Sequence, residues 1–116
     1  MVRGRPEGLN RTEKDLLTSI LAASVKSRDD ETWGYELQRT FKDLFSRSLS
    51  WGTMFPALRR LEAAGLLSSR WEQPDRGPRR RLYRLTEEGR RVSGAVQAEA
   101  RRAKVPTVAR KRTAHA

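Results

Sequence analysis

The segment SWGTMFPALRRLEAAGLL, which runs from Ser50 to Leu67, predicts one capped helix. Ser50 is a suitable N-cap residue, and Gly65 is a stop signal just after an expected last turn near Ala64. The inward face consists of apolar residues at three- and four-residue steps, namely Met54, Leu58 and Leu61. The opposite face of this helix is therefore free to meet a ligand, and it is the first candidate for a recognition surface.

Two amphipathic helices are expected before this segment. The first covers about residues 11–26, and Asn10 with Glu13 three residues later forms a capping box at its start. Its apolar stripe is Leu17, Ile20, Leu21 and Val25. The second begins at Trp33, where Thr32 can act as the N-cap. Its expected buried face is Leu37, Phe41, Leu44 and Phe45.

A β-hairpin is expected after the helices. The hydrophobic pattern changes to a two-residue period in Leu66–Glu72 and again in Leu82–Leu85. Between these strands lies QPDRGPRR, a tip rich in turn formers and arginine. Three helices followed by a two-stranded hairpin are the element order of a winged helix-turn-helix, so the fold class is mainly α with a small β-hairpin.

A last helix is expected to begin after Thr86, which is followed by two acids at the positive end of the helix dipole. Its stripe is thin and rich in alanine, with Val92, Ala95, Val96 and Glu99. Such a stripe buries little area within its own chain, so we expect a partner subunit to cover it. The expected organisation is a flexible basic arm (1–9), a winged helix-turn-helix domain (10–86), a dimerisation helix (87–103) and a disordered basic tail (104–116).

The charge balance points to a polyanionic partner. The chain has 116 residues, which is room for one domain with a single core. It carries 25 lysines and arginines against 14 acids, for a formal net charge of +11. Nucleic acid is the polyanion that a winged helix-turn-helix commonly binds.

Other classes of protein are disfavoured by what the sequence lacks. Without cysteine it has no disulfide or thiolate metal site, and its only histidine is His115, beside the C-terminus. No histidine-based acid–base pair can form, so we expect no enzyme, no metal and no cofactor. No apolar run approaches the roughly 18 residues of a membrane span, and residues 1–10 are too basic for a signal peptide. We therefore expect a cytoplasmic protein without a membrane partner.

The candidate DNA contacts lie on the third helix and the hairpin. The opening turn of a helix attracts phosphate, and its solvent face can reach base edges in the major groove. On the helix these candidates are Ser50, Trp51, Thr53, Phe55 and Arg59, and around the hairpin they are Arg76, Arg79, Arg80 and Arg81. The alternatives are that Trp51 and Phe55 belong to the core and that the hairpin arginines are merely solvated.

Three ordered motifs resemble the PadR family of transcriptional regulators. They are GYEL at Gly34–Leu37, WGTMFPALRRLEAAGLL at Trp51–Leu67, and GPRRRLYRLTEEG at Gly77–Gly89. Their order and intervals also match, and the resemblance covers about residues 10–102. Together the motifs are far more specific than any one of them.

The resemblance implies a homodimeric repressor that binds a palindromic operator in double-stranded DNA. The third helix would read the DNA, the hairpin would be the wing, and the last helix would pair with the partner's first helix. It places Tyr35, Ser50, Thr53, Phe55, Arg79 and Arg80 at DNA contacts, and it adds Leu17 and Leu21 to the dimer interface. The family often has proline where Trp51 stands and tyrosine where Phe55 stands, so a hydroxyl contact to phosphate is unavailable at Phe55.

The RGRP segment and two tryptophans each allow two interpretations. The sequence RGRP, with Arg3 and Arg5, resembles the core of an AT-hook that would lie in a minor groove, although a basic terminus without sequence preference fits the same residues. Trp33 and Trp71 are candidates to line a pocket for a small-molecule inducer near the dimer interface, or they are plain core residues. The alternative functions are an RNA-binding or ribosome-associated winged-helix protein and a module that binds an acidic protein.

Overall fold

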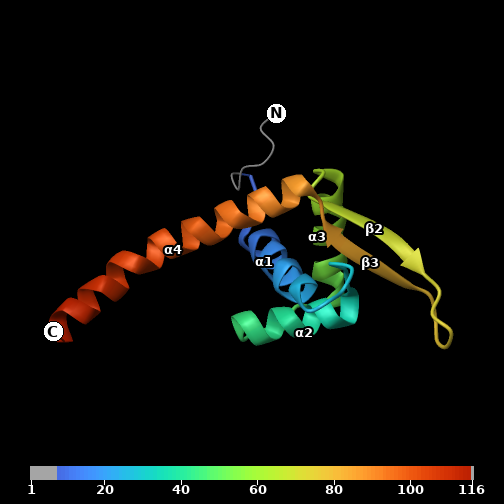
Figure 1. Ribbon diagram of the computed structural model, residues 1–116, viewed down its shortest axis with the longest axis horizontal. Helices are drawn as coiled ribbons and strands as arrows, with labels where there is room; N and C mark the ends of the chain where they lie inside the picture. The colour runs from blue at the N-terminus through green and yellow to red at the C-terminus, as the bar shows by residue number, and fades with distance from the viewer. Residues whose placement is uncertain (1–7, 116) are drawn as a thin grey trace.

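A computed structural model describes residues 8–115, with side chains through Arg102. Over this range the chain forms four helices and a three-stranded antiparallel sheet (Figure 1). The elements are α1 (Arg11–Val25), β1 (Thr32–Trp33), α2 (Gly34–Phe45), α3 (Trp51–Ala63), β2 (Leu67–Glu72), β3 (Arg80–Leu85) and α4 (Glu87–His115). The expected winged helix-turn-helix order is confirmed.

The core lies where α1, α2 and α3 meet the sheet and the first turns of α4. Its fully buried large side chains include Leu16, Leu17, Ile20, Leu37, Phe41, Met54, Leu58, Leu61 and Val92. The inward face expected for α3 is thus confirmed. Because this face is anchored on α1 and the sheet, the opposite face of α3 is held toward solvent beside the hairpin.

Local capping sets the starts of three helices. At α1 the Asn10 side chain accepts from the Glu13 amide at 2.8 Å, while Glu13 accepts from the Asn10 amide at 2.9 Å. At α3 the Ser50 hydroxyl accepts from the Thr53 amide at 3.2 Å. At α4 the Thr86 hydroxyl accepts from the Gly89 amide at 2.9 Å. These hydrogen bonds confirm the three expected caps. Each cap could be predicted because its two residues are only three positions apart.

The third strand, β1, is absent from the sequence-based expectation. Two residues are too short to show a period, and β1 forms because Thr32 and Trp33 pair with Tyr83 and Leu82 of β3. The N-cap expected at Thr32 is wrong, since α2 begins after Trp33 without a side-chain cap. Thr32 is instead fully buried, and its hydroxyl donates to Glu36 at 2.7 Å.

Two apolar residues expected in the core are exposed. Leu44 is 47% exposed and Val25 is 76% exposed, and each lies at the C-terminal end of its helix. The helical period assigns both residues to the apolar stripe. At the last turn of each helix, however, no neighbouring element within the described residues fully covers these two side chains. Hydrophobic periodicity does not show where a helix extends beyond the elements that pack against it.

The first turns of α4 pack on α1 of the same chain. Val92 is fully buried, Val96 is 7% exposed, and Lys14 on α1 pairs with Glu99 on α4 at 3.0 Å. Leu17 is also fully buried, so Leu17, Val92 and Val96 are core residues of one chain, and their expected exposure to a partner subunit is wrong. Leu21 and Ala95 are half-buried. The last helix is also longer than the expected range 87–103, because α4 extends to His115.

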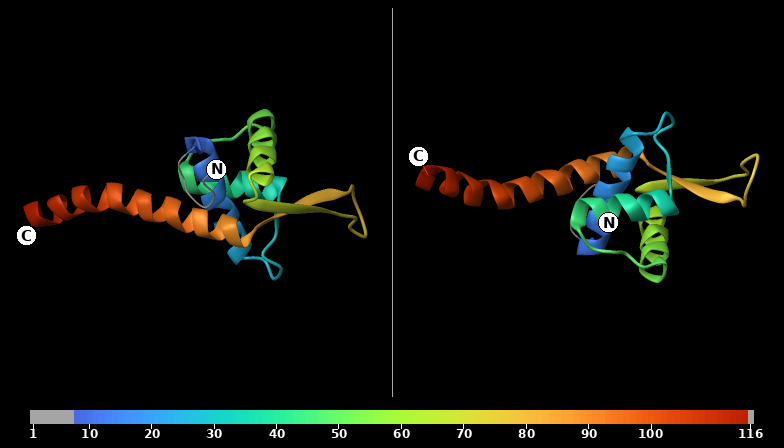
Figure 2. Two further views of the ribbon diagram at one scale, coloured as in Figure 1. Left: turned by 90° about the horizontal axis from the view of Figure 1, so that it is seen from above. Right: turned by 90° about the horizontal axis from the view of Figure 1, so that it is seen from below.

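The helical backbone of α4 continues through the segment expected to be a disordered tail. That expectation rested on the charge of 104–116. Alanine, arginine and lysine in this segment favour the continued helix, whereas Pro106 opposes it. The far half of α4 projects away from the rest of the fold (Figures 1 and 2). Among the described residues, no helix is long and apolar enough to cross a bilayer.

The start of α4 depends on Gly89. A Cβ atom at this position would collide with the backbone carbonyl of Leu66, whereas a Cβ at Gly94 on the same helix would meet nothing. We therefore expect Gly89→Ala to lower the free energy of unfolding by about 1–3 kcal/mol, as overpacking does. Gly94→Ala is the matched control and should raise stability slightly, because alanine is the better helix former. Urea unfolding of both variants measures the difference, and equal stabilities would contradict this packing.

A bidentate ion pair fastens the segment before β1 to β2. Arg70 donates to the two carboxylate oxygens of Glu31 at 2.7 and 2.8 Å, and these hydrogen bonds lower the pKa of Glu31 below its ordinary value of 4.5. A lowered folded-state pKa adds stability above the unfolded-state pKa, and this stability is lost as the pH falls through the folded-state value. Solvent screens this pair, so we expect a small effect on the free energy of unfolding. Glu31→Gln should flatten the acid side of the stability profile, and an unchanged profile would contradict this.

Candidate nucleic-acid interface

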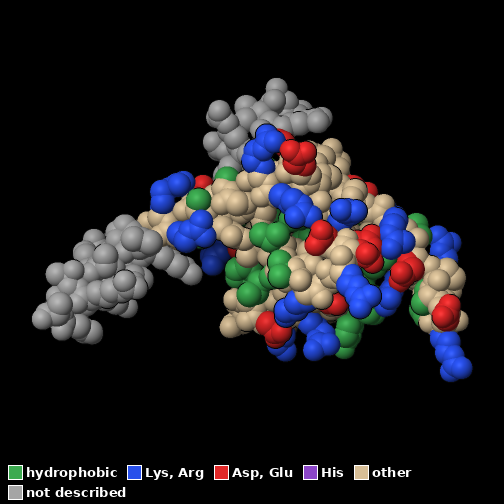
Figure 3. Space-filling model, in the orientation of Figure 1, with side chains coloured by type: hydrophobic (Ala, Val, Ile, Leu, Met, Phe, Trp, Pro, Cys, Tyr) green, Lys and Arg blue, Asp and Glu red, His purple; other side chains and the backbone are tan. Residues whose placement is uncertain are grey.

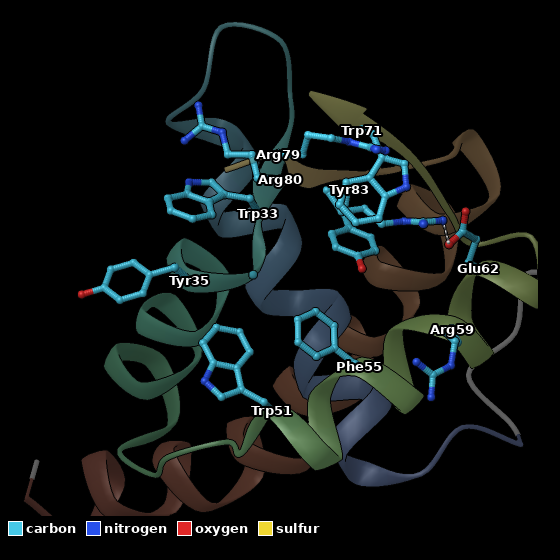
Figure 4. Close-up of a pocket in the computed structure, with 12 residues that line it drawn as sticks. Trp33, Tyr35, Trp51, Phe55, Arg59, Glu62, Trp71, Arg79, Arg80 and Tyr83 are labelled. Carbon is cyan, nitrogen blue, oxygen red and sulfur yellow. Dashed lines mark ion pairs between the residues drawn. The ribbon is translucent and has the colours of Figure 1, made fainter. Parts of the chain in front are cut away.

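The outward face of α3 looks across a cleft toward the hairpin. Trp51, Phe55, Arg59 and Glu62 follow one another at four-, four- and three-residue steps, so they share a face of the helix. The hairpin supplies the opposite wall, and the start of α2 closes one end (Figure 4). The cleft has a volume of about 600 Å³.

Six aromatic residues line the cleft. They are Trp33, Tyr35, Trp51, Phe55, Trp71 and Tyr83. Trp51 and Phe55 stack on each other with ring centroids 5.3 Å apart, and Trp33 stacks on Tyr35 at 5.8 Å. Tyr35, Trp51 and Trp71 are 52%, 42% and 53% exposed. These three residues are surface residues, so the alternative that Trp51 belongs to the core is excluded, while Phe55 is half-buried against the core.

Tyr83 is the buried member of the aromatic set. It lies opposite Ser69 in the β2–β3 register and is only 5% exposed. Burial is the main cause that raises the pKa of its phenol above the ordinary value. Its buried ring lines the cleft from β3.

Arginines of the hairpin lie on the tryptophan rings. The Arg79 and Arg81 guanidinium carbons are 4.7 and 5.4 Å from the Trp71 ring centroid, and that of Arg80 is 4.8 Å from the Trp33 centroid. Such cation–π contacts hold these guanidinium groups against the aromatic walls. Arg79, Arg80 and Arg81 are thus positioned by the fold, which differs from a merely solvated loop, whereas Arg76 is exposed.

Acidic side chains of the protein neutralise part of this positive charge. Arg80 pairs with Glu72 at 2.9 Å, and Arg81 pairs with Glu62 at 3.6 Å. By contrast, Arg59, Arg76 and Arg79 have no carboxylate partner among the side chains that the structure describes. These arginines carry the charge that remains available to an anionic ligand.

The opening turn of α3 is exposed at the mouth of the cleft. The Ser50 hydroxyl both caps the Thr53 amide and donates to the Thr53 hydroxyl at 3.1 Å, so its hydrogen atom is already used. The Thr53 hydroxyl keeps its own hydrogen atom and can donate to a ligand. Free amides of a first helical turn favour an anion, so a phosphate fits here.

The structure brings most of the expected site residues together. Those that line the cleft are Tyr35, Trp51, Phe55, Arg59, Arg79, Arg80 and Arg81, joined by Trp33 and Trp71. Ser50 and Thr53 lie at the first turn of α3, and Arg76 is exposed in the loop that joins β2 to β3. Arg3 and Arg5 lie outside the described residues. Basic side chains are spread over the body and extend along the hairpin (Figure 3).

Gly34 and Glu62 are site residues that the sequence reasoning missed. A Cβ at Gly34 would approach the Trp51 ring to 3.1 Å, so glycine allows the close packing of α2 against α3 there. Glu62 holds Arg81 in place and also accepts from the Ser69 hydroxyl at 2.7 Å. Glu62 lies three residues after Arg59, and this spacing could have predicted that the two share the outward face of α3. Within the described part of the chain, no cluster of potential metal ligands is present.

Comparisons with known proteins agree on one family. The family model described as "Transcriptional regulator PadR-like family" matches residues 23–95. A PadR family transcription regulator from Clostridium difficile R20291 is 31% identical, with a TM-score of 0.63 over 79% of this chain and 90% of that one. A PadR family regulator from Eggerthella lenta is 29% identical, with a TM-score of 0.62 over 82% and 79% of the two chains. No curated protein matched the chain.

A more distant structure shares the fold alone. The circadian clock associated protein Pex from Anabaena is 20% identical, with a TM-score of 0.58 over 82% of this chain and 83% of that one. The family model, by contrast, covers more than half of the present chain and includes α2, α3 and the hairpin that together form the cleft. The protein therefore belongs to the PadR-like family of transcriptional regulators.

Proposed function

We propose that this regulator is a sequence-specific repressor that binds an inverted-repeat operator as a homodimer in the cytoplasm, at the nucleoid. In this proposal α3 enters the major groove, and the β2–β3 hairpin lies on the flanking backbone or in the adjacent minor groove. Repression follows from occupying a promoter. The observation that supports it most directly is the exposed face of α3, flanked by Arg59, Arg76 and Arg79 without carboxylate partners in the described structure.

The exposed face of α3 offers a small set of groups for reading bases. Arg59 can donate to a guanine through two N–H groups, and Thr53 can donate or accept one hydrogen bond. The exposed indole of Trp51 can meet a thymine methyl group. Arg60 is unavailable for this purpose because it donates to the buried carboxylate of Glu13 at 2.6 Å. Arg59 and Thr53 are therefore our candidates for direct base recognition.

The projecting half of α4 is our candidate for the dimer interface. The start of α4 is used within the chain, because Val92 and Val96 pack into the core. Farther along, the helix leaves the body of the molecule, where a second copy can pack against it (Figure 2). A two-fold dimer presents two α3 helices to half-sites about one helical turn, or roughly 34 Å, apart.

Selection of operators from genomic DNA tests the whole proposal. We expect the recovered fragments to share an inverted repeat, and sedimentation of the full chain to give the mass of two copies. A duplex with one half-site should bind more weakly than the intact repeat, because the second half-site contact is lost. A monomer in solution, or a preference for structured RNA over every recovered duplex, would refute the proposal.

The unpaired arginine at the wing provides a sharper test. Arg79→Ala should lower the slope of log affinity against log salt by about 0.9 unit, because one fewer phosphate is neutralised. Arg84→Ala is the matched control, since it removes the same charge from an exposed β3 position outside the cleft. Binding of one duplex is measured by fluorescence anisotropy over a salt series. Equal slopes for the two variants would show that Arg79 does not contact phosphate.

A further inference from the structure

Duplex binding uses the arginines of the cleft and an edge of Trp51 but leaves the other aromatic side chains of its walls unexplained. All three tryptophans and both tyrosines of the chain line this one cleft. In a duplex the faces of the bases are stacked on one another, and only their edges reach a protein in the grooves. The exposed side chains of Trp51 and Trp71 therefore gain little stacking from duplex DNA. They match a flat ring that is free to enter the cleft.

The rings surround a common hollow. Trp51 and Phe55 border it from α3, while Trp33 borders it from β1 and Trp71 from β2 (Figure 4). An aromatic ligand between these walls can stack on either side, as nucleobases do on protein aromatic side chains. At about 600 Å³, the cleft falls within the usual range for small-molecule sites, roughly 300–1,000 Å³.

The charges of the cleft favour an anionic ligand. Arg59 and Arg79 line it without a carboxylate partner within the described range. The one carboxylate in the lining, Glu62, is already held by Arg81 and by the Ser69 hydroxyl. Guanidinium groups bind phosphate through paired N–H donors. A ligand with a flat ring and a phosphate group complements both features of the cleft.

We propose that the cleft between α3 and the hairpin binds a free mononucleotide, with its base among the tryptophans and its phosphate at Arg59. The same side chains form the proposed DNA-facing surface, so nucleotide and duplex exclude each other. The regulatory consequence rests on the proposed function, whereas nucleotide binding itself does not. Release from DNA is then direct competition at one surface and needs no change in the spacing of two subunits.

Tryptophan fluorescence of the full chain tests nucleotide binding without DNA. Because every tryptophan lines the cleft, titration with AMP should change the emission in a saturable way, and calorimetry should give the same affinity. Adenosine should bind at least about tenfold more weakly, since it lacks the charged group. Equal binding of adenosine and AMP, or no saturable change with AMP, would overturn the proposal.

Variants separate the site from the rest of the surface. Trp71→Ala and Arg59→Ala should each weaken AMP binding about tenfold or more, in line with the loss of one stacking or phosphate contact. Both positions are exposed, and thermal unfolding checks that the variants fold. Trp71→Phe should restore most of the affinity lost in Trp71→Ala. Leu44 and Arg84 lie outside the cleft, so Leu44→Ala and Arg84→Ala should leave AMP binding unchanged.

Two further measurements identify the occupant. If a short single-stranded oligonucleotide binds in the cleft and AMP does not, the free mononucleotide is the wrong occupant. AMP should also raise the apparent Kd of an operator duplex in proportion to its concentration, as a competitor does. Duplex binding that is unaffected by saturating AMP would overturn the competition. AMP binding by a protein that ignores every duplex would instead refute the proposed function and leave the nucleotide site standing.

Discussion

The burial of one face of α3 is the constraint on which the rest of the molecule depends. Met54, Leu58 and Leu61 are fully buried, so the helix cannot rotate without exposing them to water. The ion pair between Arg60 and the buried Glu13 joins the same helix to the start of α1. With its inward face held in this way, α3 presents Trp51, Phe55 and Arg59 toward the hairpin as a rigid set.

The hairpin is positioned by the same core. Leu67 of β2 and Leu85 of β3 are directly opposite in the register, and both are buried. Side chains alternate along a strand, so the face that carries these leucines also carries Trp71 and Arg81 farther out. α3 and the hairpin therefore share one anchored framework, and the cleft between them is built from regular elements.

The distribution of charge and aromatic side chains in the cleft has a physical logic. The guanidinium groups of Arg79 and Arg80 lie on the indole rings of Trp71 and Trp33. Glu62 and Glu72 hold Arg81 and Arg80 in place, while Arg59 and Arg79 stay available within the described structure. One surface thus combines fixed positive charge with stacking platforms. This combination is the basis for placing DNA and a nucleotide at the same location.

Features that depend on neighbours along the chain could be predicted from the amino-acid order. These include the caps at Asn10, Ser50 and Thr86, the inward face of α3 and the order of helices and strands, because a few residues set each of them. Only the tertiary structure decided the pairing of β1 with β3, the exposure of Leu44 and the burial of Leu17 and Val92. It also decided that Trp33 and Trp71 share a cleft with α3. Strand pairing and burial depend on which segments meet in space, and local periodicity carries no information about that meeting.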